Sequence, residues 1–344
     1  MDDLIGLLRL LVEHESPTGS TATLRDLLLG LLRDAGADAH ADGEHIVAHV
    51  GEGAGHVLVL GHFDTVWPVG RLAEAPFTVS GEEATGPGVF DMKGGLVSLL
   101  YALKLARPAR PVRIVLTADE EIGSPDGARV VEQHAGDAVA VFGLEPPLPG
   151  GTLKVGRRGV ARVRITVRGR EAHAGLDVAA GVSAIDELID HVAALRRPSV
   201  NVGTISGGTR ANVVAGHATA ELGLRFATPD EESAIFARLD SLTPIRDGAT
   251  ISVETLTRRP AWEPSASTEL AGHVRTVARE LGETIGAAIS PGAGDANLTG
   301  ARGIPTVDGL GPRGHGAHAR DETVELPSIR ARGELLARLL TVPR

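Results

Sequence analysis

Hydrophobic residues recur at helical spacing at the start of the chain and at intervals along it. We predict helices over these ranges: Asp2–Glu13, Thr21–Ala35, Gly94–Ala106, Asp126–His134 and Thr268–Leu281. Between them lie short, wholly apolar runs: His56–Leu60, Val112–Thr117, Ala138–Phe142 and Pro305–Leu310. Such runs are typical of strands buried on both faces. Strands that alternate with helices predict an α/β domain, with a mainly parallel sheet covered by helices on both faces.

The middle of the chain has a different pattern. From Val160 to Arg168 apolar and polar residues alternate, as they do in a strand with one solvated face. The elements predicted after this strand are a helix, two strands, a helix and a strand: Ala179–Arg196, Val200–Ser206, His217–Phe226, Asp230–Leu242 and Thr250–Thr257. The order β-α-β-β-α-β is that of a ferredoxin-like α+β domain.

Segments rich in proline and glycine flank this unit, at 145–151 and at 259–264. Chain segments of this composition commonly join domains. We therefore predict a discontinuous larger domain, residues 1–153 and 263–344, with the ferredoxin-like domain, residues 154–262, inserted into it.

Composition narrows the classes of function. The net charge of −10 argues against nucleic acid as a partner, because phosphate binding needs a basic surface. The chain has no cysteine, so a metal would be held by His, Asp and Glu. We find no secretory signal and no apolar run of roughly 18 residues that could span a membrane. The expectation is a cytoplasmic enzyme, or a mature form whose leader was removed.

Metal-ligand residues follow one predicted strand after another. The segments that follow the four apolar runs, in order, are GHFDT (61–65), ADEEIG (118–123), GLEPP (143–147) and GPRGHGAH (311–318). A further acidic segment with Asp91 opens a helix. Because ligands bind beyond the carboxyl ends of parallel strands, these side chains are expected to meet at one edge of the sheet.

Each of these residues also has a plainer interpretation. His62 and Asp64 are two residues apart, so they project to the same side of an extended segment, yet His62 alone fits a turn equally well. Asp91 alone fits a helix N-cap better than a ligand. The adjacent acids Glu120 and Glu121 are usually a solvated turn, and Glu145 alone is more often no ligand. Only their recurrence at one edge favours a metal site.

Together these segments resemble the M20 metallopeptidase family, most closely its glutamate carboxypeptidase (carboxypeptidase G2-like) branch. The longest matches are GHFDTVWPVGRLAEAPFTVSGEEATGPGVFDMKGG (61–95) and ADEEIGS (118–124). Shorter matches, in the same order along the chain, are GLEPP (143–147), EAHAG (171–175), GGTRANVV (207–214) and HARDE (318–322).

The resemblance implies a role for each matched residue. Two zinc ions, with cobalt or manganese as alternatives, would be held by His62 and Glu145 on one side and by Glu121 and His318 on the other, with Asp91 as the bridge. Asp64 would orient His62, and Glu120 would be the general base. Spacing alone does not choose between His315 and His318; the ending His-x-x-Asp-Glu favours His318.

The resemblance also implies roles for the inserted domain, as a dimerisation and substrate-lid domain of a homodimer. His173 would stabilise the oxyanion, commonly in the active site of a partner subunit. Asn212 and Arg225 stand at positions that grip the substrate's α-carboxylate, although Arg225 equally fits an exposed strand arginine. The glutamate-specific branch carries a lysine where this chain has Thr152, with Lys154, Arg157 and Arg158 nearby.

The predicted function is hydrolysis of an amide bond next to a free carboxylate, releasing a C-terminal amino acid such as glutamate. The substrate would be a small peptide or an N-acyl amino acid. The alternatives are an N-acyl-amino-acid or dipeptide amidohydrolase, including a biosynthetic deacylation step, and an inactive scaffold of the same fold. A nucleotide-binding enzyme and a serine hydrolase are disfavoured, because the sequence contains neither a glycine-rich phosphate loop nor a GxSxG motif.

Overall fold

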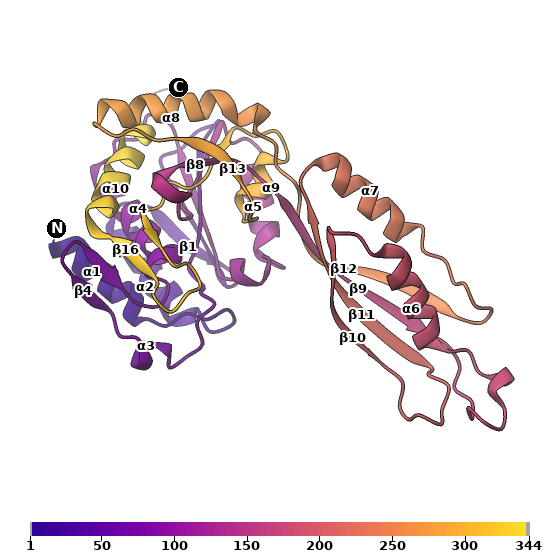
Figure 1. The fold of residues 1–344 in the computed structure, drawn as a ribbon. Coiled ribbons are helices and arrows are strands. Elements are labelled where there is room, and N and C mark those ends of the chain that lie inside the picture. The colour runs from indigo at the N-terminus through magenta and orange to yellow at the C-terminus, as the bar shows by residue number, and fades with distance from the viewer. Residues whose placement is uncertain (1, 342–344) are drawn as a thin grey trace. The chain divides into compact units, whose positions relative to one another are not determined.

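The computed structural model describes residues 2–341, which form two compact units (Figure 1). The first unit contains the residues up to Arg157 and those from Glu263 onward. The second unit, Arg158–Trp262, is a single stretch inserted between them. Each unit has its own hydrophobic core, so each is described by itself.

A six-stranded sheet forms the centre of the first unit, in the order β1-β2-β6-β3-β7-β14. Its strands are β1 (Asp38–Asp42), β2 (His45–Val50), β3 (Val57–His62), β6 (Val112–Thr117), β7 (Ala140–Gly143) and β14 (Thr306–Val307). The strands β6, β3, β7 and β14 are parallel, whereas β1 and β2 form an antiparallel hairpin at one edge. The sheet is therefore mainly parallel, as the apolar runs predict.

Helices cover both faces of this sheet. The larger core packs one face against α1 (Asp2–Glu13), α2 (Ala22–Asp34), α4 (Gly94–Leu105), α8 (Thr268–Glu280) and α10 (Leu326–Thr341). The smaller core packs the other face against α5 (Gly127–Ala135) and the short α9 (Ala296–Gly300). The strands between these two cores are buried on both faces, which is why they consist of apolar residues without alternation.

Two smaller sheets complete the first unit. The strands β8 (Leu153–Arg157) and β13 (Ala287–Ser290) pair in parallel. The other sheet has the order β15-β16-β5-β4 and contains β4 (Thr78–Ser80), β5 (Glu83–Thr85), β15 (Gly314–His315) and β16 (Thr323–Glu325). A single helical turn, α3 (Arg71–Glu74), precedes β4. Because β15 and β16 flank the segment with His318, this sheet fixes the two ends of that segment.

The second unit is a four-stranded antiparallel sheet with two helices on one face. Its elements are β9 (Gly159–Arg168), α6 (Ala184–Leu195), β10 (Val200–Gly207), β11 (His217–Phe226), α7 (Pro229–Asp240) and β12 (Thr250–Arg259). The sheet order is β10-β11-β9-β12, the order of a ferredoxin-like sandwich. The apolar residues that alternate along β9 and β11 face the helices, and the arginines of β9 lie on the other face.

The observed elements differ from the sequence prediction at several places, among them the hairpin β1–β2, the run Pro305–Leu310 and the first junction between the units, and the C-terminal helix α10 was not predicted. The hairpin β1–β2 was not predicted, because β1 (DAHAD) offers only one small residue, Ala39, to the core. The run Pro305–Leu310 contributes only two residues to the sheet, since Asp308 turns away to pair with Lys154. The first junction lies after Arg157 rather than after residue 153, because β8 pairs with β13 of the first unit.

Candidate metal centre

His62 ends β3 at the carboxyl edge of the sheet and is buried. Its Nδ1 lies 3.0 Å from the backbone oxygen of Asp64 and 3.3 Å from the carboxylate Oδ1 of the same residue. A ring whose Nδ1 donates to these acceptors presents Nε2 as a lone pair, the arrangement commonly found for metal-binding histidines. The Nε2 lies 3.2 Å from Asp91 Oδ1 and 3.5 Å from Glu145 Oε1.

Asp91 lies between two histidines. Its Oδ1 faces His62, and its Oδ2 lies 3.5 Å from Nε2 of His318. The Nε2 of His318 is also 3.1 Å from Oε2 of Glu121. One carboxylate with an imidazole at each oxygen is the geometry of a bridge between two cation positions. His315, by contrast, is an exposed residue of β15 and belongs to neither of the two ligand groups found among residues 2–341.

Glu120 and Glu121 follow β6 in a single helical turn whose backbone is held by Asp64. The carboxylate of Asp64 accepts the N–H groups of Glu120, at 3.1 Å, and of Glu121, at 3.2 Å, as well as the hydroxyl of Thr18, at 2.6 Å. Their side chains then diverge. Glu120 joins a group of potential ligands with His62 and Glu145, and Glu121 joins one with Asp91 and His318.

A second carboxylate ties the two ends of this turn together. Asp295, which is buried, accepts hydrogen bonds from the hydroxyls of Thr117 and Ser124, the residues on either side of the segment 118–123. Asp295 comes from the C-terminal part of the chain, just before α9. The positions of Glu120 and Glu121 therefore depend on a residue more than 170 positions away in the sequence.

Glu322 holds the backbone that carries Asp91. Its Oε1 accepts the N–H groups of Phe90 and Asp91, and its Oε2 accepts the N–H of Gly88 and the indole N–H of Trp67, each at 2.9 Å. A carboxylate with four N–H donors has no lone pair left for a cation. Glu322 thus orients Asp91, although it is the last acid of the HARDE segment that also contains His318.

Glu145 follows β7, and one of its carboxylate oxygens contacts two basic side chains. Its Oε2 lies 3.3 Å from Nζ of Lys154 and 3.3 Å from Nη2 of Arg157, while Oε1 faces His62. Burial would raise the pKa of Glu145, but Lys154 and Arg157 outweigh it, so the pKa lies well below the ordinary value. Arg157 in turn pairs with Asp308. Neither cation was assigned a role in the sequence analysis.

The donor set fits a pair of divalent cations. The hydrogen bonds that His318 makes to the carboxylates of Asp91 and Glu121 raise its pKa to about 10. Burial lowers the pKa of His62, but its hydrogen bonds to Asp64, Asp91 and Glu145 outweigh burial and raise that pKa well above the ordinary value. The raised pKa values of the two histidines reflect the negative charge of the carboxylates around them. Bound metal cations would neutralise that charge. The buried Oε1 of Glu121 finds no hydrogen-bond partner among residues 2–341. Two histidines and three carboxylates suit zinc, cobalt or manganese.

The remaining predicted residues lie in the second unit. His173 is exposed, and its Nδ1 accepts the N–H groups of Gly175 and Leu176, so the proton is on the outward Nε2. Asn212 is its neighbour, because its backbone oxygen accepts the N–H of Ala174. Arg225 lies elsewhere. It pairs with Val160 near one end of β11, whereas Asn212 lies beyond His217 at the other end. The eight residues of strand from His217 to Arg225 alone span roughly 26 Å.

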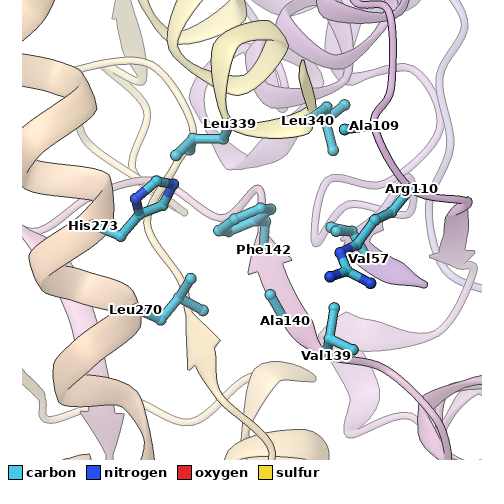
Figure 2. A pocket seen from close by; sticks show the side chains of 10 residues that line it. All are labelled: Val57, Ala109, Arg110, Val139, Ala140, Phe142, Leu270, His273, Leu339 and Leu340. Atoms are coloured by element: carbon cyan, nitrogen blue, oxygen red, sulfur yellow. The ribbon is translucent and has the colours of Figure 1, made fainter. Parts of the chain in front are cut away.

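A separate small cavity lies at the opposite end of the sheet from the ligands. Figure 2 shows its lining, which includes Val57 and Ala140, the first residues of β3 and β7, with Arg110 and His273 at its edge. Its volume of about 20 Å³ is room for a single water molecule. It is a packing defect rather than a substrate site.

Several residues that shape the site were not singled out from the sequence. Thr18, Lys154 and Asp295 each act through a tertiary contact that no spacing in the sequence reveals. Glu322 could most readily have been identified from the sequence, because it lies four residues after His318 in a matched segment.

Comparisons with known proteins show which family the chain belongs to. The model of peptidase family M20/M25/M40 matches residues 58–342. Carboxypeptidase G2 from Pseudomonas sp. (strain RS-16) is 30% identical over 319 residues, 87% of this chain and 76% of that protein. A succinyl-diaminopimelate desuccinylase from Acidiphilium cryptum (strain JF-5) is 30% identical over 322 residues, 86% and 85% of the two chains.

Solved structures share the fold. The M20 family metallo-carboxypeptidase Sso-CP2 from Sulfolobus solfataricus superposes with a TM-score of 0.76 at 15% identity, covering 99% of both chains. The aminopeptidase PepT from Bacillus cereus ATCC 10987 gives a TM-score of 0.74 at 21% identity, covering 98% of this chain and 97% of that one. Within residues 2–341, no helix combines the length and the apolar character that crossing a membrane requires. The chain belongs to peptidase family M20/M25/M40 and is a metallo-hydrolase of the M20 type.

Proposed function

We propose that the chain is a di-zinc hydrolase that cleaves an amide bond next to a free carboxylate and releases a C-terminal amino acid. The observation that carries this proposal is the position of Asp91 between His62 and His318, with Glu120 beside the His62 group. His62 and Glu145 would hold one ion, Glu121 and His318 the other, and Asp91 both.

The ions, when bound, supply Lewis acidity that polarises the scissile carbonyl and lowers the pKa of the attacking water. The protein's own groups do the rest. Glu120 accepts a proton from that water and passes it to the leaving amine. Asp64 keeps the His62 ring oriented and fixes the backbone of Glu120 at the same time. His173 stabilises the developing oxyanion through Nε2–H.

Substrate binding is assigned to Asn212 and Arg225, with arginine suited to a bidentate grip on a carboxylate. Because Arg225 lies near the end of β11 and Asn212 lies before its start, the second unit of one chain does not bring both to one carboxylate. This separation supports a homodimer formed through the inserted domain, in which a second copy supplies His173 and Asn212. A cytoplasmic location stays a prediction.

The residues near the site restrict the identity of the released amino acid less than they restrict the type of reaction. Thr152 stands where the glutamate-specific branch has lysine, and the nearby Lys154 and Arg157 are engaged by Glu145. This favours, as the second candidate, an N-acyl-amino-acid or dipeptide amidohydrolase, including a deacylation step in biosynthesis. The desuccinylase relative is consistent with that candidate.

The test is metal content measured together with hydrolysis, before and after chelation. The substrates are N-acyl and N-succinyl amino acids, dipeptides and benzoyl-glutamate. We expect about two metals per chain, activity lost to the chelator and regained with zinc or cobalt, and a substrate with a free carboxylate as the best one. A protein that binds metal and cleaves none of these would support the inactive scaffold, and a protein that binds no metal would refute the ligand assignment.

A further inference from the structure

The two proposed metal positions differ in whether the second oxygen of their ligand glutamate, Glu145 or Glu121, is already bound by another side chain. Glu145 presents Oε1 toward His62, while its Oε2 is engaged at 3.3 Å by both Lys154 and Arg157. Glu121 presents Oε2 toward His318, and its Oε1 is buried with no hydrogen-bond partner among residues 2–341. One glutamate therefore has a single oxygen to offer a cation, and the other has two.

Contacts with other residues hold Arg157 and the backbone of Lys154 beside Glu145. Arg157 donates to Asp308 at 2.5 Å and to the backbone oxygens of Gly292 and Ala293, at 2.9 and 3.0 Å. Lys154 is buried, and its backbone pairs with Asp308 in both directions. The side chain of Arg157 and the backbone of Lys154 are therefore both anchored by contacts other than those with Glu145.

The two basic side chains, Lys154 and Arg157, differ in which carboxylates balance their charge. The charge of Arg157 is offset by Asp308, whereas the one carboxylate paired with Lys154 among the described residues is Glu145. A buried ammonium beside a ligand carboxylate lowers the electron density that this carboxylate donates and repels an incoming cation. Lys154 therefore has the larger influence on the affinity of this position.

We propose that Lys154, with Arg157, restricts Glu145 to one ligand oxygen and makes the His62–Glu145 position the weaker of the two metal positions. The Glu121–His318 position then fills first. This inference rests on the proposed function and assigns Lys154 a tuning role toward the metal rather than a role in substrate binding. Glu120 also lies on the His62 side, so every comparison leaves it unchanged.

The decisive experiment measures zinc binding by equilibrium dialysis in two single-position backgrounds. His318→Ala leaves the His62–Glu145 position, and His62→Ala leaves the Glu121–His318 position. In the first background, Lys154→Met should tighten zinc binding about tenfold, the lower end of the effect of outer-shell partners. In the second background it should change binding less than about twofold. Lys104→Met, on the exposed side of α4, is the matched control and should change neither.

The unaltered chain gives a second test that does not depend on the folding of a variant. With one equivalent of zinc, the imidazole NMR signals of His318 should shift before those of His62. Equal dissociation constants for both positions, the reverse order of filling, or an equal effect of Lys154→Met in both backgrounds would overturn the inference. Each of these outcomes leaves the proposed function standing, whereas a chain that binds no zinc removes the proposed function itself.

Discussion

Glu322 accepts the backbone N–H of Asp91 at 2.9 Å, and the same carboxylate holds three further N–H donors of the surrounding loops. Replacing Glu322 with Gln puts an amide NH₂ against donors that need an acceptor. We expect about a 10- to 100-fold loss of zinc affinity, because Asp91 loses its support. Equilibrium dialysis of Glu322→Gln checks this.

The matched control for Glu322 is Glu325→Gln, three residues further along. Glu325 pairs with Arg313 and, among residues 2–341, its side chain makes no hydrogen bond to the loop of Asp91, so its loss should leave zinc affinity unchanged. Equal losses in the two variants would mean that the effect is general destabilisation of the small sheet and not orientation of Asp91.

Glu120→Gln should abolish turnover while keeping the metals. The change removes the proton acceptor but not a ligand of either position, so we expect kcat to fall about 10²- to 10⁴-fold. Zinc content, measured on the same sample, should stay that of the parent. Glu132→Gln, on the exposed surface of α5, is the control. Loss of zinc from Glu120→Gln would instead make Glu120 a ligand.

Asp295→Ala should lower kcat more than it changes KM. The substitution removes the carboxylate that joins the hydroxyls of Thr117 and Ser124 and loosens the segment that carries Glu120. We expect about 1–3 kcal/mol of lost stability and about a tenfold fall in kcat. Thr299→Val breaks a hydroxyl pair in the adjacent helix α9 without touching that segment, so it should lose stability but keep kcat. A similar fall in kcat for Thr299→Val would count against the positioning role.

His56 should make the chain less stable in mild acid. It is buried, and burial followed by the charge of Arg113 lowers its pKa below the ordinary 6.5. Its contribution to stability is present above about pH 6.5, where both states are neutral, and is lost as the pH falls through the folded-state value, since the unfolded chain binds the proton first. Urea unfolding at about pH 7.5 and about pH 5.5 should show a smaller difference for His56→Gln than for the parent. The exposed His217→Gln should show the parental difference.

The small cavity of Figure 2 offers a stabilising substitution. Val57→Ile adds one methyl group beside a space of about 20 Å³ and should stabilise the chain by about 0.5–1 kcal/mol. Val59→Ile adds the same group two residues along β3, where the side chain is fully buried and does not line the cavity, and should destabilise. Thermal unfolding of the pair decides whether that space is available.

Periodicity was sufficient to predict most of the long elements whose burial is one- or two-sided along their whole length, although the helix α10 (Leu326–Thr341) was not predicted. The helix Asp2–Glu13 and the strands Val112–Thr117 and His217–Phe226 were predicted with their observed bounds. Short strands such as β4, β5, β15 and β16 were not, because two or three residues carry no period. Their places are set by pairing with distant partners, as Thr323 pairs with both Thr85 and His315.

The metal-ligand candidates could be found from the sequence because each follows a strand or opens a helix. What spacing left open, the choice between His315 and His318, depends on a turn: His318 has a φ of +63°, an uncommon conformation that directs its ring to Asp91 and Glu121. The supporting residues Thr18, Lys154 and Asp295 are joined to the site only by the folded backbone.

The separation of Asn212 from Arg225 by nearly the whole length of β11 has a consequence for how the enzyme behaves in solution. If one substrate carboxylate needs both, a lone chain is incomplete, and specific activity falls on dilution below the concentration at which chains associate. Two inactive variants, Asn212→Ala and Arg225→Ala, would then complement each other when mixed, because each mixed pair contains one intact site assembled from both chains.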